Sequence, residues 1–386
     1  MKKTLFLLGF FLALAVEAQE IVSQLPFELN AGHIHVKVRV DDAEELTMAF
    51  DTGARANLID QQVAERLGFE VSGKQTVEGA SGVISIDLSK GHQISFGNTQ
   101  FQNEFFFLMD LDRLSDEDHP IDGVIGGTIL DQFITEINFE KSEIILYDRA
   151  SFQAPADHEK QKFSLYPYGI PVLTATLKLK DNTLLTGPYL VDTGAALALS
   201  TNYPLVKKHR LSKKLSPNYS YISQNVNSES LDKVGRTPSF ELLGREFKDF
   251  PLRMSQDKGG VSGSSAVDGI LGLELLKRFN LIFDFRSETL YYQANDLLNE
   301  PFVENFSGIV VRKVNGQLTV EQVIPASPAE ALGINIGDII LSVDGQKEFS
   351  KASFYKYIQP LREEVNIEIL RGEKTIFLKL KPRKLI

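Results

Sequence analysis

The sequence predicts a mainly β protein built from two similar lobes and a smaller third β domain. Short apolar or alternating segments separated by turn residues recur along the chain, as in β proteins. The tetrapeptide Asp-Thr-Gly-Ala occurs at 51–54 and again at 192–195. Each copy is followed by an Asp-Gly-x-x-Gly motif, at 122–126 and at 268–272. Because both motifs recur at nearly the same offset, we infer an internal duplication.

The segment 1–18 has the pattern of a secretory signal peptide. It starts with Met1-Lys2-Lys3, continues with an apolar run to Val16, and ends on small-x-small residues at 16–18. We expect cleavage after Ala18, an exported protein that is periplasmic or secreted, and no stable membrane span. The alternative is an uncleaved membrane anchor.

The composition of the chain excludes several classes of partner and of catalytic site. The 386 residues are 43% hydrophobic, enough for two or three domains with their own cores. A net charge of −10 argues against nucleic acid as a partner. The absence of cysteine excludes disulfides, thiolate nucleophiles and cysteine-based metal sites. The sequence also lacks a phosphate-binding glycine-rich loop, a Gly-x-Ser-x-Gly elbow and a zinc-protease His-Glu-x-x-His, so we expect neither cofactor nor metal.

The first lobe, about 22–150, contains three predicted elements in order. They are a hairpin of strands 33–40 and 46–50, a short helix at 128–133, and a hairpin of strands 137–139 and 144–147. The second lobe, about 160–298, repeats this order with a hairpin of 173–179 and 184–191, a helix at 273–279 and a hairpin of 281–285 and 290–292. The polar segment 151–162, which carries Pro155, is predicted to be a linker.

The tail, about 302–384, has a different pattern. Strands are predicted at 307–311, 320–324 and 339–343, followed by a hairpin of 365–370 and 375–380. Ser327 and Pro328 are typical of the cap and first position of a short helix. A second helix is predicted at 351–359.

Two Asp-Thr-Gly turns can place two carboxyls face to face. Such a pair cannot ionise fully, so it shares a proton and can act as acid and base together. Threonine can donate a hydroxyl that ties the turns together, and glycine lets the backbone approach and supply an N–H. The apolar-apolar-Gly segments can pass behind the turns and brace them.

With these motifs the region of about 25–295 resembles an aspartic protease of the retropepsin-like or pepsin-like type, fused as a single-chain pseudo-dimer. The resemblance implies a bilobal, pseudo-two-fold β fold with Asp51 and Asp192 as the catalytic pair at the lobe interface. It implies that this pair activates a water to hydrolyse peptide bonds, and that the chain works as a monomer. The supporting residues would be Thr52, Gly53, Thr193 and Gly194, with Gly126 and Gly272 as the braces.

The same resemblance implies a glycine-rich flap over the cleft. The segment in this place consists of Gly79, Ala80, Ser81 and Gly82. Its counterpart in the second lobe, residues 224–228, lacks glycine and departs from the flap pattern. Ala54 and Ala195 stand where pepsin-like enzymes often have a hydroxyl that favours ionised aspartate. We therefore expect a pH optimum less acidic than that of pepsin.

The tail resembles a PDZ domain of the bacterial protease-associated kind, through the string from Ile324 to Gly345. A PDZ domain is a β-barrel with two helices that binds a peptide as an added strand, often by its terminal carboxylate. The residues in the place of the peptide-binding loop are Ser307, Gly308, Ile309 and Val310, with serine where a first glycine is common. The domain could instead only pack against the lobes. A further alternative is that the lobes no longer cut, and serve as a scaffold for exported peptides.

Two further groups have residue types that can bind metals. His33 and His35 share one face of a strand, but no third ligand is evident, which favours a packed or solvated pair. The acidic residues between Asp110 and Asp118 could bind calcium, although they lack the spacing of an EF-hand and a solvated loop explains them equally well.

Overall fold

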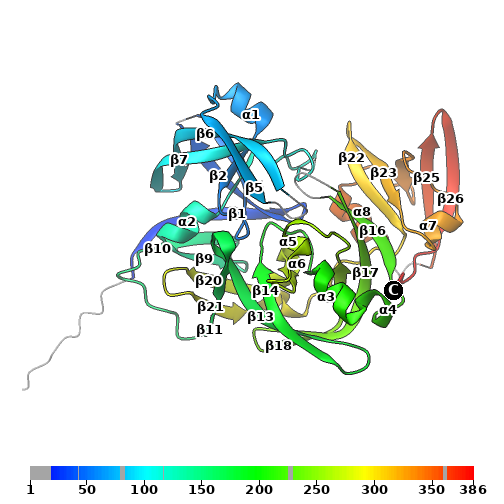
Figure 1. Cartoon of the computed structure of the whole chain (residues 1–386). Coiled ribbons are helices and arrows are strands. Elements are labelled where there is room, and N and C mark those ends of the chain that lie inside the picture. The colour runs from blue at the N-terminus through cyan, green and yellow to red at the C-terminus, as the bar shows by residue number, and fades with distance from the viewer. Residues whose placement is uncertain (1–18, 42, 79–82, 116, 225–228, 360–362) are drawn as a thin grey trace, which may run out of the picture.

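The computed structural model describes residues 19–41, 43–78, 83–115, 117–224, 229–359 and 363–386. The predicted signal segment and the flap residues Gly79–Gly82 lie outside these ranges. The described chain is mainly β, with sheets of 13, 8 and 5 strands, which confirms the predicted fold class. Figure 1 shows the first lobe above the second, with the strands of the C-terminal domain at the right. No helix within the described ranges is long and apolar enough to cross a membrane.

The first lobe carries two short helices, α1 (Gln61–Arg66) and α2 (Gly127–Gln132). Its strands are β1 (Ile21–Asn30), β2 (His33–Val40), β3 (Glu45–Phe50), β4 (Asn57–Asp60), β5 (Gly73–Glu78), β6 (Val83–Phe96), β7 (Thr99–Met109), β8 (Gly123–Ile125), β9 (Ile134–Asn138) and β10 (Glu143–Tyr147).

The second lobe repeats this plan with the helices α3 (Tyr203–His209), α4 (Leu211–Lys214), α5 (Gly260–Gly263) and α6 (Leu273–Leu276) and the 3-10 turns η1 (Pro167–Gly169) and η2 (Asp296–Asn299). Its strands are β11 (Glu159–Lys162), β12 (Ser164–Tyr166), β13 (Ile170–Lys178), β14 (Leu184–Val191), β15 (Leu199–Thr201), β16 (Tyr219–Gln224), β17 (Glu229–Leu242), β18 (Arg245–Met254), β19 (Gly269–Leu271), β20 (Phe279–Asp284) and β21 (Thr289–Ala294).

The duplication is visible in the strand pairing. β3 runs parallel to β8, with Phe50 opposite Ile125, and β14 runs parallel to β19, with Val191 opposite Leu271. Strand β3 leads directly into Asp51, and β14 leads into Asp192. Each acid therefore stands at the end of a buried apolar strand that is held by the strand of its own glycine motif.

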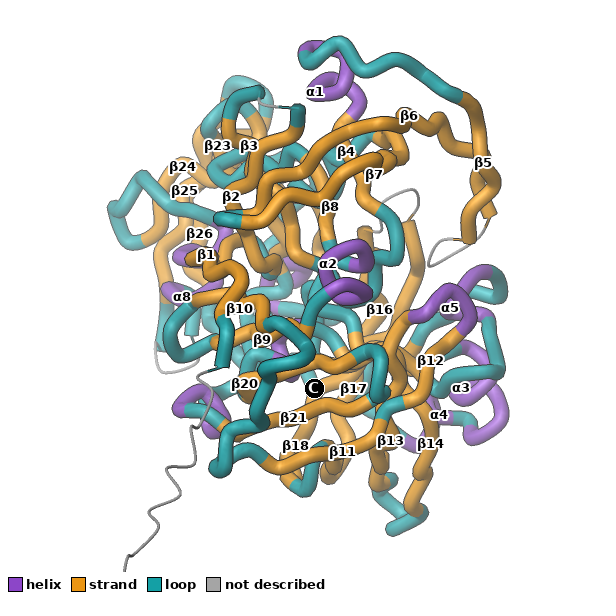
Figure 2. The backbone as a smooth tube through the Cα atoms, turned by 90° about the vertical axis from the view of Figure 1, so that its left-hand side faces the viewer, coloured by secondary structure: helices purple, strands orange, loops and turns teal. Residues whose placement is uncertain are grey.

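One sheet joins the two lobes. Its strands follow the order β11-β21-β20-β9-β10-β1, and the antiparallel pair β9–β20 crosses from one lobe to the other. Figure 2 shows these strands one below another along the molecule. Asn280 adds a side-chain bond across the junction, because its Oδ1 accepts the backbone N–H of Phe139 at 3.0 Å. The apolar core continues through both lobes.

The end of the predicted linker is a strand. Residues 159–162 form β11, which pairs with β21 at the edge of the shared sheet. This strand is polar on both faces because it covers a sheet edge rather than a core, so it lacks the apolar alternation that would predict it. The helix predicted at 273–279 is also shorter, since Phe279 already belongs to β20 and pairs with Ala294.

The C-terminal domain has its own core and sheet, with the order β22-β23-β24-β25-β26. The strands are β22 (Ile309–Val314), β23 (Gln317–Val323), β24 (Ile339–Val343), β25 (Val365–Arg371) and β26 (Lys374–Leu380), and the helices are α7 (Pro328–Ala331) and α8 (Lys351–Tyr357). Ser327 caps α7 as predicted, because its side chain accepts the N–H of Glu330. Strand β22 is an edge strand that lies beside α8.

Candidate active site

The two Asp-Thr-Gly turns meet between the lobes. The Asp51 N–H donates to the Ile125 carbonyl at 2.9 Å, and the Asp192 N–H donates to the Leu271 carbonyl at 3.0 Å. Phe50 and Val191, which precede the two acids, are fully buried. These anchors fix the direction in which each carboxyl leaves its strand.

A symmetric set of hydrogen bonds ties the turns together. The Thr52 hydroxyl donates to the Val191 carbonyl at 2.9 Å and accepts the Thr193 N–H at 3.1 Å. The Thr193 hydroxyl donates to the Phe50 carbonyl at 3.0 Å and accepts the Thr52 N–H at 3.0 Å. Both threonines are fully buried, so each bond satisfies a backbone group that water cannot reach.

The glycines of the turns leave room for the opposite acid. A Cβ on Gly53 would lie 2.7 Å from Cγ of Asp192, and one on Gly194 would overlap the Asp51 carboxyl. Their N–H groups are donors in the site. Gly53 N–H donates to Asp51 Oδ1 at 2.7 Å, and Gly194 N–H donates to Asp192 Oδ1 at 2.9 Å and to Asp51 Oδ1 at 3.2 Å.

The two brace glycines pass directly behind the turns. A Cβ on Gly126 would overlap the backbone carbonyl of Asp51, and one on Gly272 would overlap the carbonyl of Leu197. Any side chain at these positions would push the turn that carries the acid. The structure thus brings the dyad, both threonines and the four glycines into one compact arrangement.

The surroundings of the dyad favour a single shared proton. Burial raises the pKa of Asp51 above its usual value, against a hydrogen bond from Asp192 that lowers it. Burial raises the pKa of Asp192 further, because the charge of Asp51 and the hydrogen bond to it act in the same direction. Two half-buried carboxyls in contact resist carrying two charges, so the monoprotonated pair spans a wide pH range.

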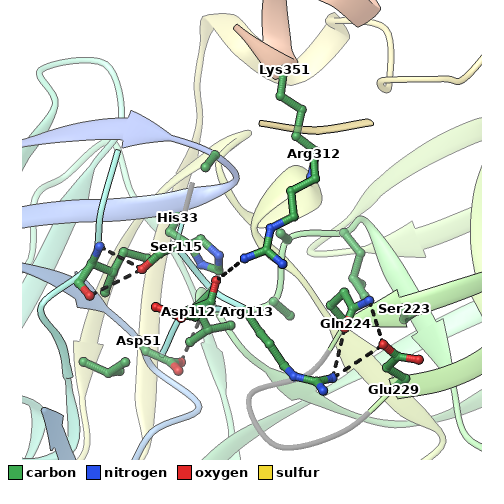
Figure 3. A pocket seen from close by; sticks show the side chains of 18 of the residues that line it. His33, Asp51, Asp112, Arg113, Ser115, Ser223, Gln224, Glu229, Arg312 and Lys351 are labelled. Atoms are coloured by element: carbon green, nitrogen blue, oxygen red, sulfur yellow. Dashed lines mark hydrogen bonds and ion pairs between the residues drawn. The ribbon is translucent and has the colours of Figure 1, made fainter. Parts of the chain in front are cut away.

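The dyad opens into a cavity of about 1220 Å³. Figure 3 shows Asp51 and His33 at this cavity, with Arg312 and Lys351 on one side and Ser223, Gln224 and Glu229 on another. Both lobes and the C-terminal domain therefore line it. The cavity is large enough for an extended peptide chain.

Two hairpins are candidates to cover the cavity, and the predicted flap residues Gly79–Gly82 stay a prediction because they lie outside the described ranges. Strands β5 and β6 form the expected first-lobe hairpin, but none of their described residues lines the cavity. The second-lobe hairpin β16–β17 does line it, from Tyr221 to Gln224 and again from Glu229. Strand pairing such as Ile222 with Leu231 builds this hairpin without a glycine signal.

The predicted peptide-binding loop of the C-terminal domain is closed by its own side chains. The N–H groups of Ser307 and Gly308 donate to Asn305 Oδ1 at 3.1 and 2.8 Å, and that of Ile309 donates to the Ser307 hydroxyl at 3.0 Å. Val310 pairs with Gln322 inside the sheet. Sequence reasoning missed Asn305, although an asparagine two residues before the loop is a known turn signal.

The two histidines lie at the start of β2, and His33 adjoins the dyad. Burial, helped by the charges of His35 and Lys351, lowers the pKa of His33 to about 4, opposed by a hydrogen bond to the Gly194 backbone. Burial also lowers the pKa of His35. Within the described ranges, the cluster of Asp60, Asp110 and Asp112 is the group that could hold a metal, and it contains no histidine.

Comparisons with known proteins agree with parts of this picture. Residues 36–129 match the family model for aspartyl proteases, and residues 319–371 match that for PDZ domains. Two curated proteins of Xylella fastidiosa, from strains Temecula1 and 9a5c and each named "Putative zinc metalloprotease", are 39% identical over 95 residues. That match covers 22% of this chain and 21% of either relative, so the chain spans about a fifth of their length.

Among solved structures, the aspartic proteinase from Irpex lacteus matches with a TM-score of 0.44 and 13% identity, over 72% of this chain and 99% of that one. The two family models cover separate parts of the chain, in the order that the sequence predicts. The chain therefore contains an aspartyl protease domain and, after it, a PDZ domain.

Proposed function

We propose that the protein is an exported aspartic-type endopeptidase, in which Asp51 and Asp192 activate the water that cuts a peptide bond. The observation that carries the proposal is the pair of hydrogen-bonded carboxyls, one from each lobe, at a cavity of peptide size. A single chain supplies both acids, so a monomer suffices. Export is proposed from the signal pattern of residues 1–18.

The unequal environments suggest a role for each acid. Asp192, whose carboxyl accepts one backbone N–H where that of Asp51 accepts two, keeps the proton and donates a hydrogen bond to the substrate carbonyl oxygen. Asp51, which accepts the N–H groups of Gly53 and Gly194, stays ionised and takes a proton from the water. The water oxygen then bonds to the carbonyl carbon. Collapse of this intermediate breaks the C–N bond as the leaving nitrogen receives a proton.

The name of the Xylella relatives raises a metal-dependent reaction as the alternative. Zinc proteases of the common type carry two histidines in a His-Glu-x-x-His motif, and this sequence has no such motif. His158-Glu159 is followed by lysine at the position of the second histidine. The chemistry of the two converging aspartates needs no metal, so we propose the aspartic mechanism.

Cleavage mapping tests the proposal directly. The protein is incubated with a proteome-derived peptide library from pH 3 to 8, beside Asp51→Asn and Asp192→Asn and with or without a chelator. We expect cuts that vanish in both variants and survive the chelator, with an optimum less acidic than that of pepsin. If the chelator stops cutting while both Asn variants still cut, the protein is a metalloprotease. Peptides left intact at every pH, but bound saturably by wild type and variants, would identify a scaffold.

A further inference from the structure

The PDZ domain contributes two cations to the cavity that holds the dyad. Arg312 from β22 and Lys351 from the start of α8 are both exposed and both line it. In Figure 3 the Arg312 side chain runs toward Asp112, and Lys351 lies on the same side of the cavity. Burial is the main cause that lowers the pKa of His33, and the charges of His35 and Lys351 add to it.

Other cations of the cavity are engaged by partners. Arg113 bonds Gln224 and lies 3.8 Å from a carboxylate oxygen of Glu229, and Lys313 pairs with Asp118 at 2.5 Å. Arg253 donates to the Ser223 hydroxyl at 3.2 Å and lies over the ring of Tyr221.

Arg312 and Lys351 lack such charge partners. Arg312 donates one hydrogen bond, at 3.3 Å, to the backbone carbonyl of Asp112. No carboxylate among the described residues pairs with it, and Lys351 has neither an ion pair nor a hydrogen bond within the same ranges. Glu321, the PDZ carboxylate that also lines the cavity, forms no ion pair with either. Two unneutralised cations facing one cavity attract an anionic group of a ligand.

The usual place for a carboxylate in a PDZ domain is already filled. The backbone donors of Ser307, Gly308 and Ile309 bond to Asn305 and Ser307 of the same chain. The edge of β22 is also engaged, because the Val311 N–H donates to the Tyr355 hydroxyl at 3.1 Å. A carboxylate of the substrate therefore finds free donors at Arg312 and Lys351 rather than at this loop.

We propose that Arg312 and Lys351 form a carboxylate-binding subsite of the protease cleft, so that the enzyme prefers peptides with a carboxylate on the side of the cut that faces the PDZ domain. The inference rests on the proposed function, because the subsite selects substrates only if the protein cuts peptides. Two sources fit the chemistry: the side chain of an aspartate or glutamate, and the carboxylate at the end of a peptide.

The subsite is tested by binding, in full-length protein carrying Asp192→Asn so that nothing is cut. The probes are peptides that differ only in Glu against Gln at each position, each with a free or an amidated C-terminus. We expect one Glu position, or the free terminus, to tighten binding roughly 5- to 20-fold at low salt, the size expected for two exposed charge pairs. High salt should weaken this preference.

Adding Arg312→Gln and Lys351→Gln should bring the Glu and Gln peptides to equal affinity. Arg312→Glu with Lys351→Glu should reverse the preference, so that the Gln peptide binds more tightly than the Glu peptide. The control is Lys356→Gln, an exposed lysine of the same helix that does not line the cavity, which should keep the wild-type preference.

Equal binding of Glu and Gln peptides by the parent, or a Glu preference that persists in the double Gln variant, would overturn the subsite. A preference for the free terminus alone assigns the C-terminal carboxylate as its ligand. Because binding is measured without cutting, even a protein with no protease activity shows whether the two cations select a carboxylate. Cleavage mapping with the wild type then separates failure of the proposed function from failure of the subsite.

Discussion

At the scale of single residues, the site depends on two positions that have no side chain, Gly53 and Gly194. Gly53 and Gly194 each lie against the carboxyl of the other lobe, so the two acids can approach only because neither glycine has a Cβ. The same glycines donate N–H groups to the acids. Space and hydrogen bonding at the dyad are therefore set by the same two positions.

Gly194→Ala should abolish most of the proposed peptidase activity while the fold persists. The new methyl overlaps the Asp51 carboxyl and must displace it, and a displacement near 1 Å costs about 100-fold in rate. The cost of overpacking should be about 1–3 kcal/mol of unfolding free energy. Peptide cleavage rates and thermal melting measure the two effects.

Gly73→Ala is the matched control for this substitution. Nothing lies within 4 Å of a Cβ at this position in β5, so both activity and melting temperature should stay near wild type. Full activity in Gly194→Ala would show that the glycine is not needed for contact between the acids.

Asp192→Asn should stabilise the protein in a pH-dependent way. The folded pKa of Asp192 lies well above 3.8, so its ionisation costs stability as the pH rises from about 3.8 through that raised value. Asparagine avoids this cost. We expect no difference in melting temperature below this window and a gain of roughly 2–6 °C above it, for about 1–2 kcal/mol.

Melting curves across the pH range check this prediction. The control is Glu373→Gln in the turn between β25 and β26, which removes the charge of an exposed side chain and should shift the melting temperature little at any pH. A gain for Asp192→Asn that is equally large at low pH would contradict the assigned cause.

At the scale of elements, the two acid turns act as one unit because each threonine bonds the backbone of the other turn. Strands β3 and β14 end in these turns. The four hydrogen bonds between the two turns satisfy backbone groups that have no strand partner there. The lobes are thus joined twice, at the dyad and at the β9–β20 pair.

Thr52→Val should separate these turns with little change in volume. It removes the hydroxyl and leaves the Val191 carbonyl and the Thr193 N–H unsatisfied in a buried place, which costs about 2–4 kcal/mol. Thr52→Ser keeps the hydroxyl and should lose about 1 kcal/mol through the missing methyl. Melting temperature and cleavage rate, measured on both variants, should fall much further for valine. Equal losses would indicate that packing, rather than the hydrogen bonds, holds the turns.

The features that could be predicted are those that a short sequence motif indicates. The dyad and its glycines could be predicted because the duplication repeats them within short motifs. The role of hairpin β16–β17 could not, because glycine is the usual flap signal and this hairpin depends instead on pairs such as Tyr219 with Val234. The polar strand β11 could not be predicted either, because only its pairing with β21 makes it a strand.

At the scale of the whole molecule, the PDZ domain bridges both lobes beside the cavity. It reaches the acidic loop of the first lobe, where the Gly316 N–H donates to the Glu117 carboxylate at 3.0 Å. It reaches the second lobe at β16, which Figure 1 shows next to β22 and β23. No sequence motif predicts such contacts, because they join segments about 100 to 200 residues apart.

At β16 the side chain of Gln322 makes two hydrogen bonds to the backbone of Ile222, as a neighbouring strand would. Gln322 Oε1 accepts the Ile222 N–H at 2.8 Å, and its Nε2 donates to the Ile222 carbonyl at 2.7 Å. Gln322→Glu keeps the shape but replaces the donor by a carboxylate that faces the carbonyl. We expect the loss of about 1–2 kcal/mol, and therefore roughly tenfold faster hydrogen exchange at the Ile222 amide and along β16.

The control is Gln317→Glu, an exposed change in the same strand, which should leave this exchange unchanged. If Gln322→Glu also leaves β16 protected, the PDZ domain does not hold the second-lobe hairpin. If exchange and cleavage rate change together, the position of the PDZ domain controls access to the dyad.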